Sequence, residues 1–411
     1  MTKKASTPAL RFKGFTYTWK QRKLNEVVNV YDGVHQTPDY KDSGVMFLSV
    51  ENISILKSEK YISEEAFQKD YKVYPQKGDV LMTRIGDVGT PNVVETTEKV
   101  AFYVSLALLK PTKINSYFLC NSIQSPLFQK GLKDRTLVTA IPQKINKDEI
   151  GKVNIILPAS SQEQQLIGEY FRNLDHLITL HQRKYDKLTN MKKSMLEKMF
   201  PKNGANVPEI RFKGFTDAWE QRKLGEIADV TKLAGFEFTE HIVYSDEGDI
   251  IALRGLNVKK GCLVLDDVKY IDNSNFSKLG RSKLFINDVL FTYVGTVGEL
   301  AIIPENNRFY LAPNVSRIRF QNRFYAPYMV QQMGSKFFYD NMIFPLIATS
   351  SQPALSMENI RKFIVSVPKD FEEQEKIGQY FAKLDRLITL HQRELEKLKN
   401  LKKACLEKMF V

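Results

Sequence analysis

Residues 163–200 read EQQLIGEYFRNLDHLITLHQRKYDKLTNMKKSMLEKMF, and residues 373–410 read EQEKIGQYFAKLDRLITLHQRELEKLKNLKKACLEKMF, with 25 of 38 aligned positions identical. In both copies apolar side chains recur at alternating intervals of three and four residues, which is the spacing of a coiled-coil seam. In the first copy they are Ile167, Phe171, Leu174, Ile178, Tyr185, Leu188, Met195 and Met199. Neither copy contains proline. Each is therefore predicted to be one long helix whose apolar stripe packs against the other copy.

Three shorter repeats accompany the long one. The signature RFKGFTYTWKQRKLNEV at residues 11–27 returns as RFKGFTDAWEQRKLGEI at residues 211–227, with 12 of 17 positions identical. GDVLMTRIGDVG at residues 78–89 matches NDVLFTYVGTVG at residues 287–298, and residues 139–158 share their layout with residues 349–368. The glycines and apolar runs of these repeats indicate strands joined by turns. Between the landmarks the two blocks diverge.

The order of these repeats predicts a geometry. The chain runs signature, variable block and long helix, and then repeats that order. We expect an α/β (α+β) fold with two globular blocks separated by two long antiparallel coiled-coil helices. A pseudo-two-fold axis would bring the chain ends together in a circular arrangement. The expected domains are a first globular block at residues 1–160, a spacer helix at 161–200, a second globular block at 201–370 and a spacer helix at 371–411.

Composition limits the class of protein. The chain has 411 residues, a net charge of +13 and a pI near 9.3, which favours a polyanionic partner such as nucleic acid. Its three cysteines and five histidines show neither a disulfide framework nor the spacing of a metal site. No signal peptide or membrane-spanning run is evident, so a cytoplasmic location is expected.

The repeat preserves residues outside the apolar seam, and this needs an explanation beyond helix pairing. A recent duplication would have left the variable blocks alike as well. Identical outer surfaces joined to dissimilar blocks instead predict that two copies of one partner protein dock on the helices. The candidate docking residues are Arg183, Lys192 and Lys193, with their counterparts Arg393, Lys402 and Lys403.

The chain carries an RFKGF…W…QRKL signature, a GDVL…G..G loop, a proline followed by an EQ..I helix start, and an alternation of repeated and variable segments. In these features it resembles the specificity (S) subunits of type I restriction-modification enzymes. The resemblance covers nearly the whole chain. It implies two target recognition domains, each reading one half of a bipartite site in double-stranded DNA, with the helices setting the gap. The implied partners are two modification subunits, which methylate adenine with S-adenosylmethionine, and restriction subunits, which use ATP and Mg.

A non-catalytic role agrees with the motifs. The chain has no G-x-x-x-x-G-K-[ST] phosphate loop, no G-x-G-x-x-G opening a helix, and no Asn or Asp before a Pro-Pro-aromatic sequence. We therefore expect no catalytic residue, no metal site and no cofactor of its own. A two-headed adaptor that binds proteins without DNA specificity is the alternative. A self-contained nuclease or methyltransferase has no supporting motif.

Charge does not mark the variable blocks as DNA-binding. Residues 28–162 carry 16 Lys and Arg against 15 Asp and Glu, and residues 228–371 carry the same counts. Basic residues do gather late in each block, where each of them either faces phosphates or lies on a solvated strand face. They are Lys110, Lys113, Lys130, Lys133, Arg135, Lys144 and Lys147, and then Arg308, Arg317, Arg319, Arg323 and Lys336. The candidates for base reading are Arg84, Gln143 and Lys144 in the first block and Arg254, Tyr293 and Gln352 in the second.

Overall fold

The computed structural model describes residues 7–202, 204–233, 235, 240–259, 261–347 and 353–410. The chain divides into two compact units, residues 1–183 with 392–411, and residues 184–391. Each unit contains one variable block, called a head below, together with part of each long helix.

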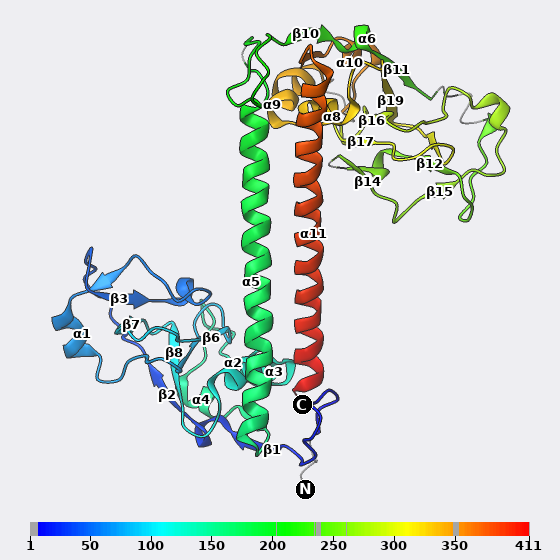
Figure 1. Ribbon diagram of the computed structural model, residues 1–411. Coiled ribbons are helices and arrows are strands. Elements are labelled where there is room, and N and C mark those ends of the chain that lie inside the picture. Colours follow the sequence, from blue (N-terminus) through cyan, green and yellow to red (C-terminus); the bar gives the residue numbers. More distant parts are fainter. Residues whose placement is uncertain are drawn as a thin grey trace. The chain divides into compact units, whose positions relative to one another are not determined.

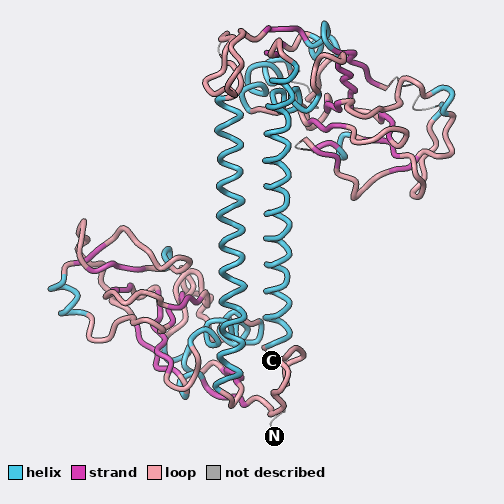
Figure 2. Tube along the Cα trace, viewed as in Figure 1, coloured by secondary structure: helices cyan, strands magenta, loops and turns pink. Residues whose placement is uncertain are grey.

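The first head is built from short strands and helices connected by loops (Figure 2). Its elements (Figure 1) are β1 (Lys20–Lys23), β2 (Val28–Asp32), β3 (Val45–Leu48), β4 (Tyr61–Ile62), α1 (Glu64–Asp70), β5 (Val80–Thr83), β6 (Pro91–Val93), β7 (Val100–Phe102), β8 (Leu106–Pro111), α2 (Ser116–Gln124), α3 (Pro126–Lys133), α4 (Lys147–Gly151) and β9 (Asn154–Leu157).

Two sheets organise the first head. Strands β2-β8-β5-β6 form an antiparallel sheet, and β4-β3-β7 form a second sheet in which β3 and β7 are parallel. Successive residues of a strand point to opposite faces. Val80 and Met82 of β5 therefore enter a core shared with α2, α3 and the long helices, while Leu81 enters the core against β3 and β7. The two-sided burial explains why Val80, Leu81 and Met82 are apolar in succession.

The second head repeats this plan. Its elements are β10 (Glu220–Lys223), α6 (Leu224–Ile227), β11 (Ala228–Lys232), β12 (Ile251–Leu253), β13 (Val258–Lys259), β14 (Cys262–Leu263), β15 (Lys269–Tyr270), β16 (Val289–Thr292), β17 (Leu300–Ile302), β18 (Phe309–Leu311), β19 (Val315–Phe320), α8 (Ala326–Met333), α9 (Lys336–Phe338), α10 (Met357–Arg361) and β20 (Ile364–Val367). Sheets β11-β19-β16-β17 and β15-β12-β18 correspond to the two sheets of the first head, and β12 and β18 are again parallel. The hairpin β13–β14 is additional.

The two repeated stretches form α5 (Ser161–Lys198) and α11 (Phe371–Met409). Within the first unit they run antiparallel, since Tyr170 contacts Cys405 and Asp175 pairs with Lys402. Within the second unit Lys192 pairs with Asp385, which gives the same direction. The predicted α/β fold with a long antiparallel helix pair is confirmed.

The apolar stripe is used in two ways. Ile167 and Phe171 of α5 are fully buried in the core of the first head, and Ile377 and Phe381 of α11 are buried in the second. Farther along α5, Ile178, Tyr185 and Leu188 are only half-buried. The helix start is thus part of its own head, and only the middle depends on helix–helix packing.

Glycine permits the close approach of each long helix to its head. A Cβ on Gly168 would lie 2.8 Å from Asn115 Oδ1, and one on Gly378 would lie 2.7 Å from the Tyr325 ring. Such distances are too short for any side chain. The same close contact therefore occurs at both helix starts.

Candidate nucleic-acid interface

Two loops lie side by side in the first head, and we call them the first loop pair: residues 84–90, after β5, and residues 137–146, before α4. The Ile145 amide donates to Arg84 O at 3.0 Å, and the Gly86 amide donates to Gln143 O at 2.8 Å. The Gln143 side-chain amide in turn donates a hydrogen bond to Gly86 O at 3.0 Å. Gly86 and Gly89 have φ of +81° and +98°, values that favour glycine. Arg84, Gln143 and Lys144, the candidates for base reading in this head, are therefore neighbours in the structure.

The second head has the corresponding loop pair, residues 293–299 and the segment that resumes at Pro353. The Leu355 amide donates to Tyr293 O at 2.8 Å, and the Gly295 amide donates to Pro353 O at 2.9 Å. Gly295 and Gly298 again have positive φ, at +80° and +99°. Gln352, the third candidate for base reading in this head, lies outside the described residues.

Arg84 and Tyr293 occupy equivalent positions, but neither is simply presented to solvent. Arg84 is 5% exposed; its guanidinium pairs with Asp32, and its Nε donates to Ile145 O at 3.0 Å. In the structure the Arg84 side chain holds β2 and both loops together, and base reading by Arg84 stays a prediction. Tyr293 lies beneath Lys232, whose ammonium is 5.6 Å from the ring centroid, and desolvation raises the pKa of the phenol. Asp32 and Lys232 end the equivalent strands β2 and β11.

The other candidates lie at the surface. Gln143 and Lys144 are exposed on the first loop pair. Arg254 bonds to Asp267 at 2.8 Å and borders an open cavity of about 730 Å³ that Tyr244, Lys269 and Asn314 also line. The Arg254 backbone amide donates to the Asn257 side chain, as the Ser49 amide of the first head donates to the Asn52 side chain. The two heads therefore present serine and arginine from equivalent turns.

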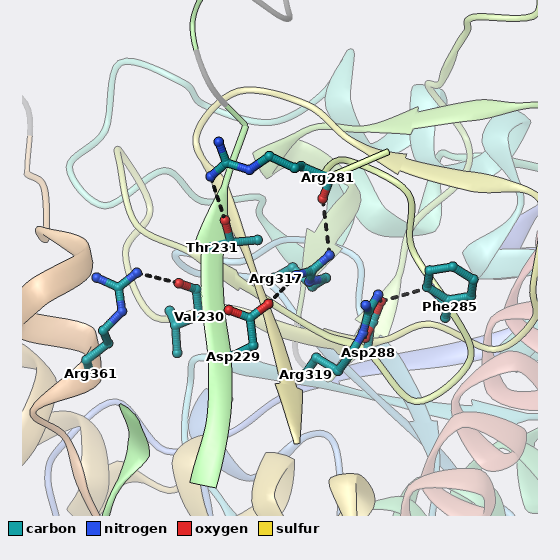
Figure 3. A network of polar contacts seen from close by, with 9 residues as sticks. All are labelled: Asp229, Val230, Thr231, Arg281, Phe285, Asp288, Arg317, Arg319 and Arg361. Atoms are coloured by element: carbon teal, nitrogen blue, oxygen red, sulfur yellow. Dashed lines mark hydrogen bonds and ion pairs between the residues drawn. The ribbon is translucent and has the colours of Figure 1, made fainter. Parts of the chain in front are cut away.

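Several of the late basic residues are committed to ion pairs inside the second head (Figure 3). Arg317 is 6% exposed, pairs with Asp229 and donates to Arg281 O at 3.1 Å. Arg319 makes two 2.7 Å bonds to Asp288 and lies 4.7 Å from the Phe285 ring; its bond to the carboxylate raises the pKa of the guanidinium. In this structure acidic neighbours pair with both arginines, and phosphate contact by either one stays a prediction.

The same pairing occurs in the first head with lysine in place of arginine. Lys110 pairs with Asp79 at 2.5 Å, at positions equivalent to Arg319 and Asp288. Elsewhere in the network, Arg281 reaches Thr231 at 3.4 Å and Arg361 donates to Val230 O at 2.6 Å (Figure 3). The residues around β11 and β19 therefore form a stabilising layer of arginines.

The helix candidates for partner docking separate into two groups. Lys192 pairs with Asp385 at 2.5 Å, and Lys402 pairs with Asp175 at 2.7 Å. Both lysines were expected to face outward, but each is half-buried between the helices because the aspartate of the other helix attracts it. Arg183, Lys193, Arg393 and Lys403 are exposed.

Sequence reasoning missed the anchor at each helix start. The Arg11 guanidinium donates two hydrogen bonds to the Glu163 carboxylate, at 2.6 and 2.9 Å. The Arg211 guanidinium donates two to the Glu373 carboxylate, at 2.6 and 2.8 Å. Both carboxylates are only 1% exposed. The bond to Glu163 raises the pKa of the Arg11 guanidinium, which therefore stays charged. The recurrence of Arg and of the Glu-Gln dipeptide in both halves was the available signal.

The following glutamine joins two further segments. Gln164 accepts from the Asn115 amide at 2.9 Å and donates to Pro158 O at 3.0 Å. Gln374 makes the same contacts with Tyr325 at 3.0 Å and Pro368 at 3.1 Å. The Glu-Gln dipeptide thus fastens the signature, the last strand and a head helix to the start of each long helix.

Within the described residues, no three His, Cys, Asp or Glu side chains are grouped so that they could hold a metal ion. Over the same residues, no helix combines the length and apolar character needed to cross a bilayer.

The structure is thus a tandem repeat. The same mixed sheet-and-helix head occurs twice, and each copy is joined to a long helix by the same Arg–Glu–Gln anchor and carries different residues on equivalent loops. The sequence profile of the type I restriction modification DNA specificity domain matches residues 17–190 and 216–400. The chain belongs to this family.

Curated relatives and a solved structure agree with this assignment. The chain is 23% identical over 281 residues to the type I restriction enzyme MjaVIII specificity subunit of Methanocaldococcus jannaschii, covering 66% of this chain and 64% of that relative. It is 23% identical over 419 residues to the putative MjaX specificity subunit of the same organism, covering 94% and 91%. The crystal structure of a type I restriction-modification S subunit from M. genitalium covers 99% of both chains with a TM-score of 0.62 and 15% identity, which shows a common fold.

Proposed function

We propose that this chain is the non-catalytic DNA-specificity subunit of a type I restriction-modification complex. Each head reads one half of a bipartite site in double-stranded DNA, and the helix pair sets the gap between the halves. Two modification subunits dock on the helices, and restriction subunits join the larger assembly. Any S-adenosylmethionine, ATP and Mg chemistry belongs to these partners.

The observation that carries the proposal is the contrast between scaffold and loops. The two heads have the same strand order, the same anchor and the same bonded loop pair. At equivalent turns they carry Ser49 and Arg254. A shared scaffold with different polar side chains on equivalent loops suits two readers of different sequences, since bases are distinguished by the donors and acceptors placed against them.

The docking surface is proposed from exposure and repetition together. Arg183 and Lys193 on α5 recur as Arg393 and Lys403 on α11, and all four are exposed. A repeated surface offers two equivalent sites, which suits two copies of one partner.

An exchange of heads tests this function. Residues 28–160 are replaced with the matching block of another specificity subunit, and methylated sites are mapped across the genome of cells expressing the complete complex. One half of the methylated sequence should change, while the other half and the gap stay the same. The reciprocal exchange of the second block is the matched control. Simultaneous change of both halves would mean that the heads are not independent readers.

A protein-binding adaptor is the second candidate, because each block carries almost no net charge and several arginines are neutralised internally. Binding of the complex to duplex DNA at several salt concentrations separates the two. Phosphate neutralisation makes log K fall steeply with log salt. Absence of binding at low salt would favour the adaptor.

A further inference from the structure

One loop of the first head differs from the rest of its surface, and we call it the finger: residues 137–144. Its base is closed by backbone bonds between Leu137 and Lys144, at 2.8 Å in one direction and 3.4 Å in the other. This pair closes a loop of six residues. The finger is therefore a short loop with a defined base.

The base of the finger is fixed to the head. Ile85 bridges to Lys144, and Gly86 exchanges two bonds with Gln143, one through the backbone and one through its side chain. Immediately after the finger, Ile145 is fully buried and both its backbone groups bond to Arg84. A loop anchored in this way holds its tip in position at little further entropic cost on binding.

The tip is apolar although it is exposed. Val138 is 67% exposed and Ile141 is 100% exposed, and Leu137 at the base is 45% exposed. Single exposed apolar residues are common on any protein surface. Three of them on one anchored loop of eight residues leave apolar surface that a partner would remove from water.

The surroundings of the finger identify the chemistry of that partner. Between residues 130 and 148 there are five basic residues, Lys130, Lys133, Arg135, Lys144 and Lys147, against two acidic ones, Asp134 and Asp148. Arg135 pairs with Glu149 at 4.0 Å, while the four lysines are exposed and make no ion pair within the described part of the chain. An apolar tip between cations fits a DNA groove, where phosphates flank the edges of the bases.

The shape of the finger selects the groove. The major groove is about 12 Å wide and admits a two-stranded element, whereas the minor groove is about 6 Å wide. The major groove also exposes the one apolar substituent on a DNA base edge, the C5-methyl group of thymine. Val138 and Ile141 offer branched aliphatic carbons to such a methyl group and no hydrogen-bonding atom of their own side chains.

We infer that the finger enters the major groove of the half-site read by the first head and that Val138 and Ile141 contact a thymine methyl group there. The inference rests on the proposed function, since it assumes that this head reads DNA. It adds that one position of the half-site is recognised by an apolar contact rather than by hydrogen bonds.

Removal of the methyl group from the DNA tests the contact. The complete complex is titrated with duplexes containing its methylated site, in which each thymine of the first half-site is replaced in turn with deoxyuridine. This keeps base pairing and removes only the methyl group. At one position the affinity should fall about fourfold, the value expected when one methyl group is no longer buried.

A double variant tests the residues. Val138→Ser with Ile141→Ser should bind the thymine duplex more weakly and should not distinguish thymine from uracil. Because both side chains are exposed, its circular dichroism melting curve should match that of the unaltered chain. Ile55→Ser is the matched control, since Ile55 is also 67% exposed on the first head but lies on a different loop; it should keep full discrimination.

Three results would overturn the inference. They are equal binding of thymine and uracil duplexes at every position, a first half-site without thymine, and retained discrimination by the double variant. Loss of co-purification with the modification subunit in the double variant would instead make the finger a protein contact. All of these results leave the proposed function intact, because the complex would still methylate a specific sequence. Failure of the proposed function would be seen in the exchange of heads, where the methylated sequence would not follow the exchanged block.

Discussion

The buried ion pairs at the two helix starts show how a few residues hold distant segments together. Arg11 lies 152 residues before Glu163, and Arg211 lies 162 residues before Glu373. A buried charge whose partner is removed is expensive because it has lost its water without compensation. Each guanidinium also donates to a backbone carbonyl six residues later, at Tyr17 or Asp217, which orients the signature itself.

Replacing Glu163 with Ala should therefore destabilise the first head strongly. The expected loss in the free energy of unfolding is about 3–5 kcal/mol, the range for breaking a buried pair. Urea denaturation monitored by Trp fluorescence measures it. The control is Glu358→Ala, which breaks the exposed pair with Lys362 and should leave the free energy of unfolding nearly unchanged. Equal effects of the two substitutions would contradict the structural role of the anchor.

The Arg84–Asp32 and Tyr293–Lys232 pairs predict a compensating exchange. Arg84→Tyr alone leaves Asp32 unpaired, and Asp32→Lys alone places a cation against the buried guanidinium; each should cost about 3 kcal/mol of stability. The double variant reproduces the Tyr–Lys contact of the second head and should recover most of that loss. Denaturation of all three variants completes the thermodynamic cycle. Additive losses would mean that the two pairs are not interchangeable.

At the scale of elements, α5 and α11 combine an apolar seam with charges beside it. Lys192–Asp385 and Lys402–Asp175 are the same pair made twice, since both residues recur 210 positions later. The pairs fix which turns of the two helices face each other. Ion pairs beside an apolar seam commonly set helix register and orientation in this way.

The exposed arginines of these helices predict a docking phenotype. Arg183→Glu with Arg393→Glu should reduce co-purification of the modification subunit while leaving the melting temperature of the isolated chain unchanged. The control is Lys192→Ala with Lys402→Ala, which should lower the melting temperature because both residues make ion pairs within the chain. Full recruitment by the charge-reversed variant would exclude these arginines from the docking surface.

A ruler role of the helices predicts a change in the gap. Four residues are inserted after Leu188 in α5 and after Thr389 in α11, which face each other in the second unit by the register of the Lys192–Asp385 pair. Four residues add about 6 Å and close to one turn, so the apolar seam stays nearly in phase. With about 3.4 Å per base pair, the methylated gap should grow by one or two base pairs, with both half-sites unchanged. An unchanged gap would show that other contacts set the spacing.

The elements were easier to predict than the contacts of particular side chains. The three-and-four spacing predicted both long helices because helical periodicity is local in sequence. The burial of Arg84 depends on Asp32, 52 residues away, and no local pattern gives that information. Lys192 and Lys402 were expected to face outward, yet the aspartates preserved with them at 175 and 385 were a sign of pairing across the helices.

At the scale of the whole molecule, the repeat closes on itself in both units. In the second unit the Ile210 amide bonds to Lys198 O at 3.0 Å, and the chain between them is continuous. In the first unit the Leu10 amide bonds to Lys408 O at 2.9 Å, although these residues stand near opposite ends of the sequence. The repeated signatures and helices allowed this circular arrangement to be predicted. The variable blocks gave no comparable information, because their loops share few residues.

Circular permutation should therefore preserve the molecule. Val411 is joined directly to Met1, which places ten residues between Phe410 and Leu10, and the chain is opened between Gly204 and Ala205, both exposed. The corresponding link from Phe200 to Ile210 has nine residues, so the new one is long enough. The permuted chain should direct methylation of the same sequence. Opening the chain between Gln164 and Gln165 instead, beside the buried anchor, should abolish methylation. Equal methylation by the two permuted chains would show that an intact chain at the anchor is not required.

The core of the first head contains Cys405, Met409 and Phe410, and the Phe410 ring packs against Trp19, Phe118 and Phe171. During synthesis these last residues leave the ribosome long after the strands that they cover. At about 5–20 residues per second, the roughly 210 residues after position 200 take on the order of 10–40 s to translate. Through that interval the first head lacks its final aromatic side chain, whereas Phe200, which fills the same place in the second head, has already been made. The first half of the chain to be translated is thus the last to complete its core.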